Sequence, residues 1–200
     1  MLYAARECYP GPLVLIGHSM GGLVASRFVA EGLQPAPAKW WRAIDALVMS
    51  SPALDPGTNA VQKLLLAVVA PALPNLAVNN GLKVDWISRD AGVVKAYAAD
   101  PLVHDRVTGR LGLFVARQGP AVIAAAPKWK TPTLLMWAGA DRCVAPAGSA
   151  AFAAGAPRDV VTVREWPGLF HEIFNEPEQD AVLTAMTDWI AAHVPEAAHA

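Results

Sequence analysis

The stretch LVLIGHSMGGLVA, residues 13–25, decides the fold of this 200-residue chain. It opens with the apolar run 13–16, which shows no alternation and is typical of a parallel strand buried on both faces. A helix is predicted from about residue 20 to residue 33, because apolar side chains there recur at the three-to-four-residue spacing of one helix face. Those side chains belong to Leu23, Val24, Phe28 and Val29.

The junction between this strand and this helix reads Gly17-His18-Ser19-Met20-Gly21, a G-x-S-x-G motif. A serine in such a turn is strained, and we expect the glycines to let strand and helix approach closely. The turn would lift the Ser19 hydroxyl above the sheet and aim the positive end of the helix dipole at a reacting carbonyl oxygen. We therefore predict that Ser19 is a nucleophile. The alternative is a glycine-rich turn with an idle serine.

Further along the chain, apolar runs at residues 46–49, 133–137 and 160–163 each predict a buried strand. A last helix is expected from about Glu176 to His193, with Asn175 as its capping residue. Strands that alternate with helices in this way indicate an α/β fold. We predict a mostly parallel sheet of about four strands with flanking helices.

Residues 54–128 interrupt this pattern. The segment shows several short helical stretches broken by prolines, and it is too long for a simple loop, which favours an inserted helical cap. The expected organisation is a core segment 1–53 with the Ser19 turn, a helical cap insertion and return over 54–128, and a second core segment 129–200.

A serine hydroxyl needs a base to become nucleophilic, and His171 is the histidine best placed for that role. It follows the strand predicted at 160–163, at the same sheet edge as Ser19. Asp141 follows the strand predicted at 133–137 and would orient His171 and stabilise its positive charge. The chain order Ser19, Asp141, His171 matches a known order of catalytic serine, acid and base. A turn-forming role for Asp141 and a helix-entry role for His171 are the alternatives.

Other residues suit these roles less well. The rivals are His18 (expected to point away from the base position), His104 (in the insertion), His193 and His199 (in or after the last helix), Asp159 (at the opposite sheet edge) and Asp180 (inside a helix). Cys143 is expected to pack without a catalytic role, and Glu172 is expected to be a solvated residue at the helix entry.

Composition limits the remaining function classes. Hydrophobic residues make up 54 % and charged residues 16 %, which excludes a disordered chain. The 16 basic and 17 acidic residues form no basic block, so no nucleic-acid partner is expected. The longest apolar run, 64–73, is shorter than the roughly 18 residues of a membrane span, and no signal peptide is recognised. Two separated cysteines, Cys8 and Cys143, indicate reduced thiols. We expect a soluble cytoplasmic protein with no metal and no cofactor.

Six stretches together resemble the α/β-hydrolase superfamily, and more narrowly its monoacylglycerol lipase and lysophospholipase branch, also labelled serine aminopeptidase-like. They are LVLIGHSMGGLVA (13–25), LVMSSPAL (47–54), LPNLAV (73–78), SRDAGVVKAYAADPLVH (88–104), PTLLMWAGADRCV (132–144) and PGLFHEIFNEPE (167–178). The resemblance covers most of the chain and implies that Ser19, Asp141 and His171 form a catalytic triad. It also implies that residues from about 55 to 115 cap an acyl tunnel and that the Met20 backbone N–H donates to the oxyanion. Ala138 stands where the family usually has glycine.

The chain departs from the family at its beginning. The family's second oxyanion donor comes from a His-Gly loop after an early strand, and this chain contains no His-Gly dipeptide. The family places about four strands before the one that corresponds to 13–17, whereas twelve residues precede it here. The expectation is a partial α/β-hydrolase fold, truncated at its N-terminus, in which strand 13–17 has an unpaired, aggregation-prone edge.

Two functional hypotheses follow. The first is a serine hydrolase that cleaves carboxylic esters of acyl lipids, with Leu64, Leu65, Leu66, Val68 and Val69 of the cap suited to an acyl chain. The second is an impaired or inactive fragment that pairs its open edge with another chain. Expected partners are a small-molecule or lipid ester, a membrane surface touched transiently by the cap, and a second copy at the open edge. Haloperoxidases and peptidases share this triad and stay open as alternatives.

Overall fold

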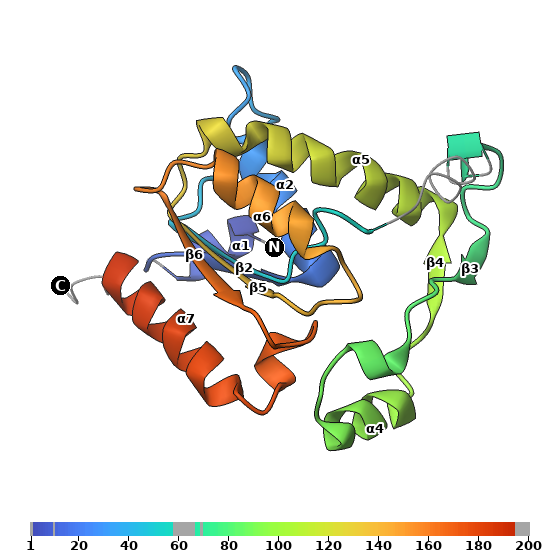
Figure 1. The fold of residues 1–200 in the computed structure, drawn as a ribbon. Coiled ribbons are helices and arrows are strands. Elements are labelled where there is room, and N and C mark those ends of the chain that lie inside the picture. The colour runs from blue at the N-terminus through green and yellow to red at the C-terminus, as the bar shows by residue number, and fades with distance from the viewer. Residues whose placement is uncertain (1, 10, 58–66, 69, 195–200) are drawn as a thin grey trace.

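A computed structural model describes residues 2–9, 11–57, 67–68 and 70–194 of the chain (Figure 1). At its centre lies a four-stranded sheet in the order β1-β2-β5-β6, in which every neighbouring pair is parallel. The strands are β1 (Val14–His18), β2 (Ala46–Ser50), β5 (Thr133–Ala138) and β6 (Val161–Trp166). The predicted α/β fold with a parallel sheet of about four strands is confirmed.

Helices cover both faces of this sheet (Figure 1). One face carries α2 (Ser19–Glu31), α5 (Gly109–Ala125) and α6 (Pro146–Gly155), and the other carries α7 (Gln179–His193). The short α1 (Leu2–Cys8) precedes β1. Because side chains alternate along a strand, β2 serves both cores: Leu47 and Met49 pack in the α2 layer, while Ala46 and Val48 pack in the α7 layer.

The outer strands are more exposed than the sequence predicts. Among the described strands β1 and β6 lie at the two edges of the sheet. Ile16 on β1 is 49 % exposed and Val163 on β6 is 41 % exposed. The prediction that 13–16 is buried on both faces is therefore wrong for Ile16, because only β2 flanks that strand in the described part of the chain.

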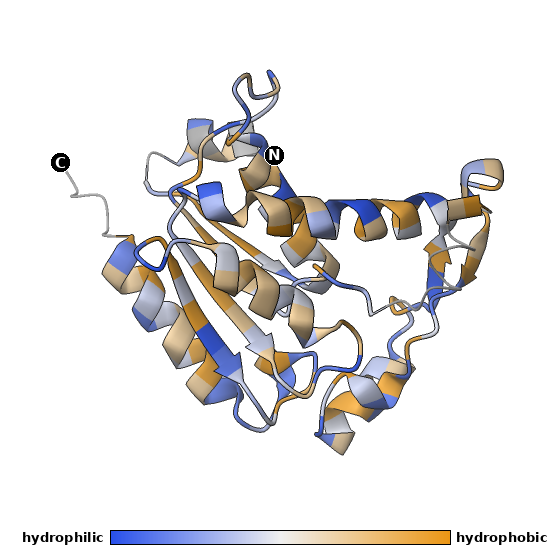
Figure 2. Cartoon of the chain, turned by 45° about the horizontal axis from the view of Figure 1, so that its top comes forward, coloured by the Kyte–Doolittle hydropathy of each residue, from blue (hydrophilic) through white to orange (hydrophobic). Residues whose placement is uncertain are grey.

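The inserted segment contains more than helices. It holds the 3-10 turn η1 (Val84–Trp86), helix α4 (Ala91–Ala99) and an antiparallel pair, β3 (Ala77–Asn79) with β4 (Arg106–Thr108). Three-residue strands are too short to show alternation, so the sequence did not predict them. Hydrophobic residues recur on this outlying part of the molecule, away from the sheet (Figure 2).

The last helix begins later than predicted. Glu178 is its N-cap, without a side-chain capping bond, and Asn175 instead ends the 3-10 turn η3 (Ile173–Asn175). The Asn175 amide bonds to the Glu172 carboxylate at 3.3 Å, so the predicted cap is wrong. Among the described helices, none combines the length and the apolar character needed to cross a membrane.

Candidate active site

Ser19 lies at the junction of β1 and α2 in a left-handed backbone conformation, with φ of 51°. A non-glycine residue held there carries strain of order 1–3 kcal/mol. The turn is tightly packed: a Cβ on Gly17 would lie 2.5 Å from the Gly21 carbonyl oxygen, and one on Gly22 would lie 2.9 Å from Pro52 Cβ. These two glycines therefore allow β1 and α2 to meet at a sharp angle.

Gly21 does not share this role. Within the described residues, a Cβ on Gly21 would have no neighbour inside 4 Å. The expectation that its lack of a side chain brings strand and helix together is wrong at this position. On α2 the exposed Gly21 and the buried Gly22 face different directions, and it is Gly22 that faces the chain at Pro52.

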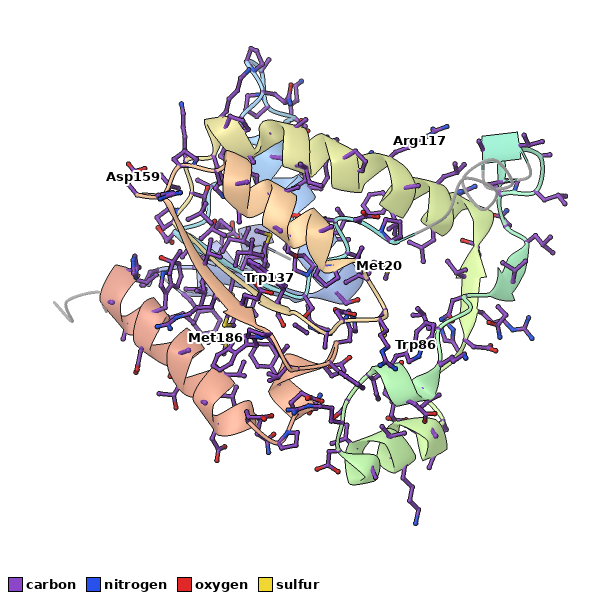
Figure 3. The ribbon with its side chains drawn as sticks, in the orientation of Figure 1. Met20, Trp86, Arg117, Trp137, Asp159 and Met186 are labelled. Atoms are coloured by element: carbon purple, nitrogen blue, oxygen red, sulfur yellow. The ribbon has the colours of Figure 1, made fainter. Side chains whose placement is uncertain are left out.

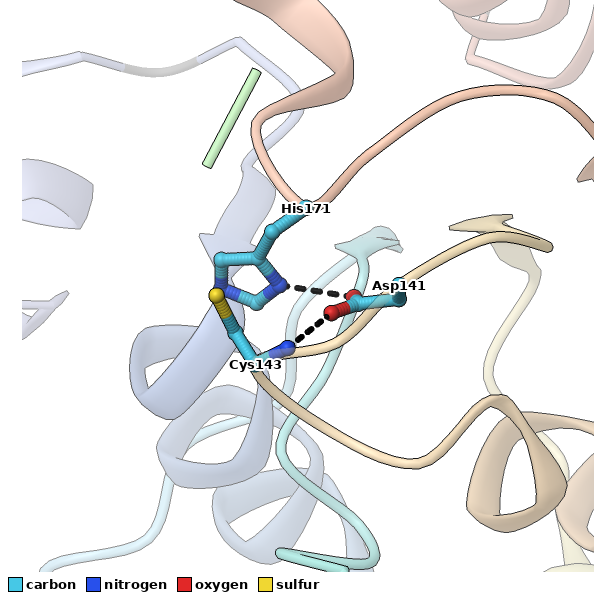
Figure 4. A group of neighbouring side chains, drawn as sticks. All are labelled: Asp141, Cys143 and His171. Atoms are coloured by element: carbon cyan, nitrogen blue, oxygen red, sulfur yellow. Dashed lines mark hydrogen bonds and ion pairs between the residues drawn. The ribbon is translucent and has the colours of Figure 1, made fainter. Parts of the chain in front are cut away.

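The structure brings Ser19, Asp141 and His171 together at the carboxyl edge of the parallel sheet. His171 Nε2 lies 2.8 Å from Ser19 Oγ. His171 Nδ1 lies 2.7 Å from Asp141 Oδ2, the contact drawn in Figure 4. The side chains of His171 and Asp141 are only 7 % and 2 % exposed, so the hydrogen bond between them lies away from bulk water.

The Asp141 carboxylate is itself held in place by its own loop. Oδ1 accepts hydrogen bonds from the backbone N–H groups of Cys143 at 2.7 Å and Val144 at 3.0 Å, which leaves Oδ2 to accept from His171. Because a carboxylate can only accept, Nδ1 of a neutral His171 carries the proton and Nε2 is free to accept from Ser19. This is the arrangement that a general base requires.

Of the rival residues, Asp159, Asp180 and His193 lie elsewhere. Asp159 lies at the far end of the sheet from Met20 (Figure 3). Asp180 lies in the first turn of α7. The His193 ring stacks on Trp189 with a centroid separation of 4.4 Å, and His104 lines the pocket described below. His199 lies outside the described residues.

The sequence analysis expected His18 to point away from the base, and this expectation is wrong. Its ring centroid lies 4.8 Å from that of His171. Because β1 pairs with β2 so that His18 aligns with Ser50, His18 Nδ1 bonds to Ser50 Oγ at 3.0 Å. Its other nitrogen, Nε2, lies 3.3 Å from Glu172 Oε1.

Glu172 is correspondingly not a solvated residue, since its side chain is 24 % exposed and faces His18. Burial alone would raise the pKa of this carboxyl, but the contact with His18 and the nearby charge of His171 outweigh burial and hold the pKa below its ordinary value. The adjacent letters His171-Glu172 were the only sequence signal for this carboxylate, and they did not reveal its partner.

A family model described as serine aminopeptidase, S33, matches residues 2–178. The chain belongs to this family. It is an α/β hydrolase similar to monoacylglycerol lipases, as the following relatives show.

Two curated relatives of this S33 family member are similar over most of its length. A monoacylglycerol lipase of Mycolicibacterium smegmatis is 34 % identical over 197 residues, covering 96 % of this chain and 66 % of the relative. The phospholipase YtpA of Bacillus subtilis is 34 % identical over 180 residues, covering 87 % of this chain and 66 % of the relative. The chain thus spans just under two thirds of the length of both proteins.

A solved structure agrees with this assignment. The crystal structure of the Paleococcus ferrophilus monoacylglycerol lipase superposes with a TM-score of 0.83 at 33 % identity, covering 96 % of this chain and 73 % of that chain. The described strands and helices of the S33 family member therefore form part of an α/β-hydrolase fold.

A pocket of about 530 Å³ opens between the Ser19 turn and the insertion. Ser19 and His171 line it from the sheet side together with Cys143 and Glu172. The insertion contributes an apolar set, Leu82, Val84, Ile87 and Val103, and a polar set, Asn80, Lys83, His104 and Asp105. A volume of this size is typical of small-molecule sites.

Cys143 lies next to the three aligned residues. Burial, followed by the Asp141 charge, raises the pKa of its thiol to about 12, so the thiol stays protonated. Asp141, Cys143 and His171 each offer an atom that could bind a metal ion, and these atoms all lie within 4.8 Å of one another (Figure 4). Both ring nitrogens of His171 already have partners, so a cation bound here would displace Ser19 or Asp141 from the imidazole.

Proposed function

We propose that this chain carries the acylation site of a serine hydrolase that cleaves carboxylic esters of acyl lipids. The observation that supports it best is the placement of His171, 2.8 Å from the Ser19 hydroxyl and 2.7 Å from the Asp141 carboxylate. Nucleophile, base and orienting acid would then be Ser19, His171 and Asp141.

In the proposed reaction, Ser19 Oγ attacks the ester carbonyl carbon while His171 Nε2 takes the hydroxyl proton. The tetrahedral intermediate collapses, the ester C–O bond breaks, and His171 returns the proton to the leaving alcohol. Water then attacks the acyl-serine with His171 again as base, releasing the carboxylic acid and restoring Ser19. Asp141 stabilises the imidazolium in both halves.

The backbone N–H of Met20 is the proposed donor to the oxyanion, because Met20 lies in the first turn of α2, directly after Ser19. Backbone N–H groups of a first turn have no partner within the helix and point along the positive end of its dipole. Loss of one oxyanion donor lowers kcat by about 10²- to 10³-fold in comparable enzymes.

Lipid esters are the substrate class that pocket and relatives favour together. The apolar set Leu82, Val84, Ile87 and Val103 would contact an acyl chain. Of the cap residues first suggested for this contact, Val68 is 64 % exposed and does not line the described pocket, and Leu64, Leu65, Leu66 and Val69 lie outside the described residues. Exposed apolar side chains of the insertion, with Leu102 at 87 %, support transient contact with a lipid surface. Residues 54–128 would then comprise the cap and the return to the sheet, where α5 packs, between the core segments 1–53 and 129–200.

The second candidate is a catalytically impaired or inactive fragment that pairs its open sheet edge with another chain. Exposed apolar side chains beside β1 and the Ser19 turn favour it: Ile16 at 49 %, Val24 at 49 % and Met20 at 43 %. In that case the purified chain self-associates and is acylated slowly or not at all.

Covalent labelling by a fluorophosphonate probe tests the proposal. The wild-type chain is expected to be labelled at Ser19, and Ser19→Ala is expected to abolish labelling. Ser26→Ala is the matched control, because Ser26 lies on the same helix and its buried hydroxyl only bonds to the Leu23 carbonyl. Labelling that persists in Ser19→Ala contradicts the nucleophile assignment, and an unlabelled but folded wild type favours the second candidate.

A further inference from the structure

The loop that carries His171 is hydrogen-bonded to the base of the insertion. Three consecutive residues, 87–89, each bond to the segment 172–176. The bonds run from Glu172 N–H to the Ile87 carbonyl (2.8 Å), from Ser88 Oγ to the Asn175 carbonyl (3.0 Å), and from Arg89 N–H to Glu176 Oε1 (2.6 Å). Segments more than 80 residues apart in sequence are thus joined side by side, immediately after His171.

The Arg89 side chain adds an ion pair in which the carboxylate is buried and the guanidinium is 35 % exposed. Arg89 Nε donates to Glu176 Oε2, and Arg89 Nη2 donates to Glu178. Glu176 is 1 % exposed, whereas the Glu178 side chain is 45 % exposed. Burial would raise the pKa of Glu176, but hydrogen bonds from Arg89 outweigh burial and hold the pKa below its ordinary value. Glu176 therefore stays ionised inside the protein, and Arg89 is its main compensation, with further hydrogen bonds from Ser88 and the Phe170 backbone.

His171 is held by an anchor on either side. On the upstream side, the Leu169 carbonyl accepts from the Ala140 N–H at 3.2 Å, which ties the loop to the residue before Asp141. On the downstream side, the contacts of Glu176 and Glu172 tie it to residues 87–89. The upstream anchor fixes His171 relative to Asp141, and the downstream anchor fixes its distance from the insertion that covers Ser19.

We propose that Arg89 and Glu176 are a positioning pair that sets His171 against Ser19 and makes the placement of the base depend on the insertion. Neither side chain touches the reacting atoms, so the pair acts through the loop. The inference rests on the proposed function, because it assigns these residues to the same Ser19 site.

Four variants separate positioning from folding. Glu176→Gln removes the buried charge, Arg89→Met removes its partner, and Arg89→Lys retains a positive charge. Glu178→Gln is the matched control, because it removes only the exposed contact of the same guanidinium. Each is compared with wild type for the rate of fluorophosphonate labelling, for kcat and KM on a short water-soluble ester, and for amide hydrogen exchange by mass spectrometry.

Glu176→Gln and Arg89→Met are expected to slow labelling and lower kcat by about 10- to 100-fold, with KM changed less than about 3-fold, because a displaced base costs rate rather than ground-state binding. Exchange is expected to rise at 172–176 and 87–89 and stay unchanged in β2 and β5. Arg89→Lys is expected to recover part of the rate, and Glu178→Gln to remain within about 2-fold of wild type.

Wild-type rates and unchanged exchange at 172–176 in Glu176→Gln would overturn the positioning role. A fall in kcat in Glu178→Gln equal to that in Glu176→Gln would overturn the assignment to the Arg89–Glu176 pair. Should Glu176→Gln fail to fold, Arg89→Lys carries the test, and a rate and exchange identical to wild type overturn the proposal. A wild type that is not labelled refutes the proposed function instead. In that case, amide hydrogen exchange at 172–176 in the variants is the measurement that tests the positioning role.

Discussion

The His171 ring lies near two carboxylates that are related to it in different ways. Asp141 bonds directly to Nδ1, whereas Glu172 acts through its charge and through His18, whose ring is 4.8 Å from that of His171. In the proposed reaction, the positive charge that forms on His171 during proton transfer would be compensated from two sides. Ser50 completes this group by bonding to His18 from the neighbouring strand.

Replacing Glu172 by Gln is expected to change how stability depends on pH. The pKa of Glu172 is lowered in the folded state, so its contribution is present above the unfolded pKa of about 4.3 and is lost as pH falls through the folded value. The free energy of unfolding of the wild type should exceed that of Glu172→Gln by on the order of 1 kcal/mol at pH 7.

Urea unfolding between pH 3 and pH 7 measures this difference. The gap between the two proteins should close as pH falls below about 4.3. A gap that is constant across this range would show that Glu172 contributes through packing and not through charge. Asn175→Ala serves as the control, because it removes the other side chain that bonds to Glu172 without changing a charge.

The sequence was informative about Ser19, Asp141 and His171 because a turn motif and the order of sheet loops restrict where such residues lie. It was uninformative about His18 and Glu172. Their contact depends on the register of β1 against β2 and on the path of the loop after β6, and no local pattern encodes either. The prediction for Gly21 was wrong for a similar reason, since the motif does not show at which glycine the backbones approach most closely.

At the scale of elements, the angle between β1 and α2 depends on how closely their backbones approach. A side chain on Gly17 would meet backbone atoms of Gly21 and Gly22 at 2.5–2.8 Å, and backbone cannot move aside as a flexible side chain does. The observed angle between β1 and α2 is therefore possible only because Gly17 has no Cβ.

Gly17→Ala is expected to lower the free energy of unfolding by about 1–3 kcal/mol, the range for forcing extra volume into a packed site. Gly21→Ala, four residues away on an open side of α2, should be neutral or stabilising by up to about 1 kcal/mol, because alanine favours a helix over glycine. Chemical denaturation of the two variants checks the contrast. Equal losses would mean that the approach at Gly17 is looser than these distances indicate.

Element boundaries show what local pattern does and does not determine. The four strands lie within one to three residues of their predicted ends, because continuous apolar runs and parallel-sheet burial coincide. The start of α7 was missed by three residues because Asn175 and Glu178 are engaged in the loop that reaches the insertion. The β3 and β4 pair was not predicted, because pairing between residues nearly 30 apart leaves no trace in a three-residue run.

At the scale of the whole molecule, the two described sheet edges differ in what surrounds them. β1 lies beside the Ser19 turn, and its Ile16 is exposed, as is Val24 on the neighbouring α2. On β6, the exposed Val163 has polar neighbours in Arg164 and Glu165. Charged side chains on an edge strand discourage pairing with another chain, and β1 has none between Val14 and Gly17.

We therefore expect the chain to self-associate through β1. Ile16→Lys should shift the self-association midpoint to at least about 10-fold higher protein concentration, because a charge at a strand edge opposes pairing. Val163→Lys on the opposite edge is the matched control and should leave the midpoint unchanged. Sedimentation velocity over a concentration series distinguishes the two. Equal effects of both substitutions would show that association does not depend on β1. A wild type that is monomeric at every concentration would contradict the expected self-association.

The ion pair between residues 89 and 176, whose carboxylate is buried, also limits how this sequence can be recombined with its relatives. A crossover placed anywhere between those positions takes the arginine from one parent and the glutamate from the other. Chimaeras whose parents both supply the pair keep a compensated charge, whereas a parent without the arginine leaves the buried carboxylate of Glu176 without its guanidinium partner. Insertions from distant homologues are thus exchangeable only together with the carboxyl-terminal loop that receives them.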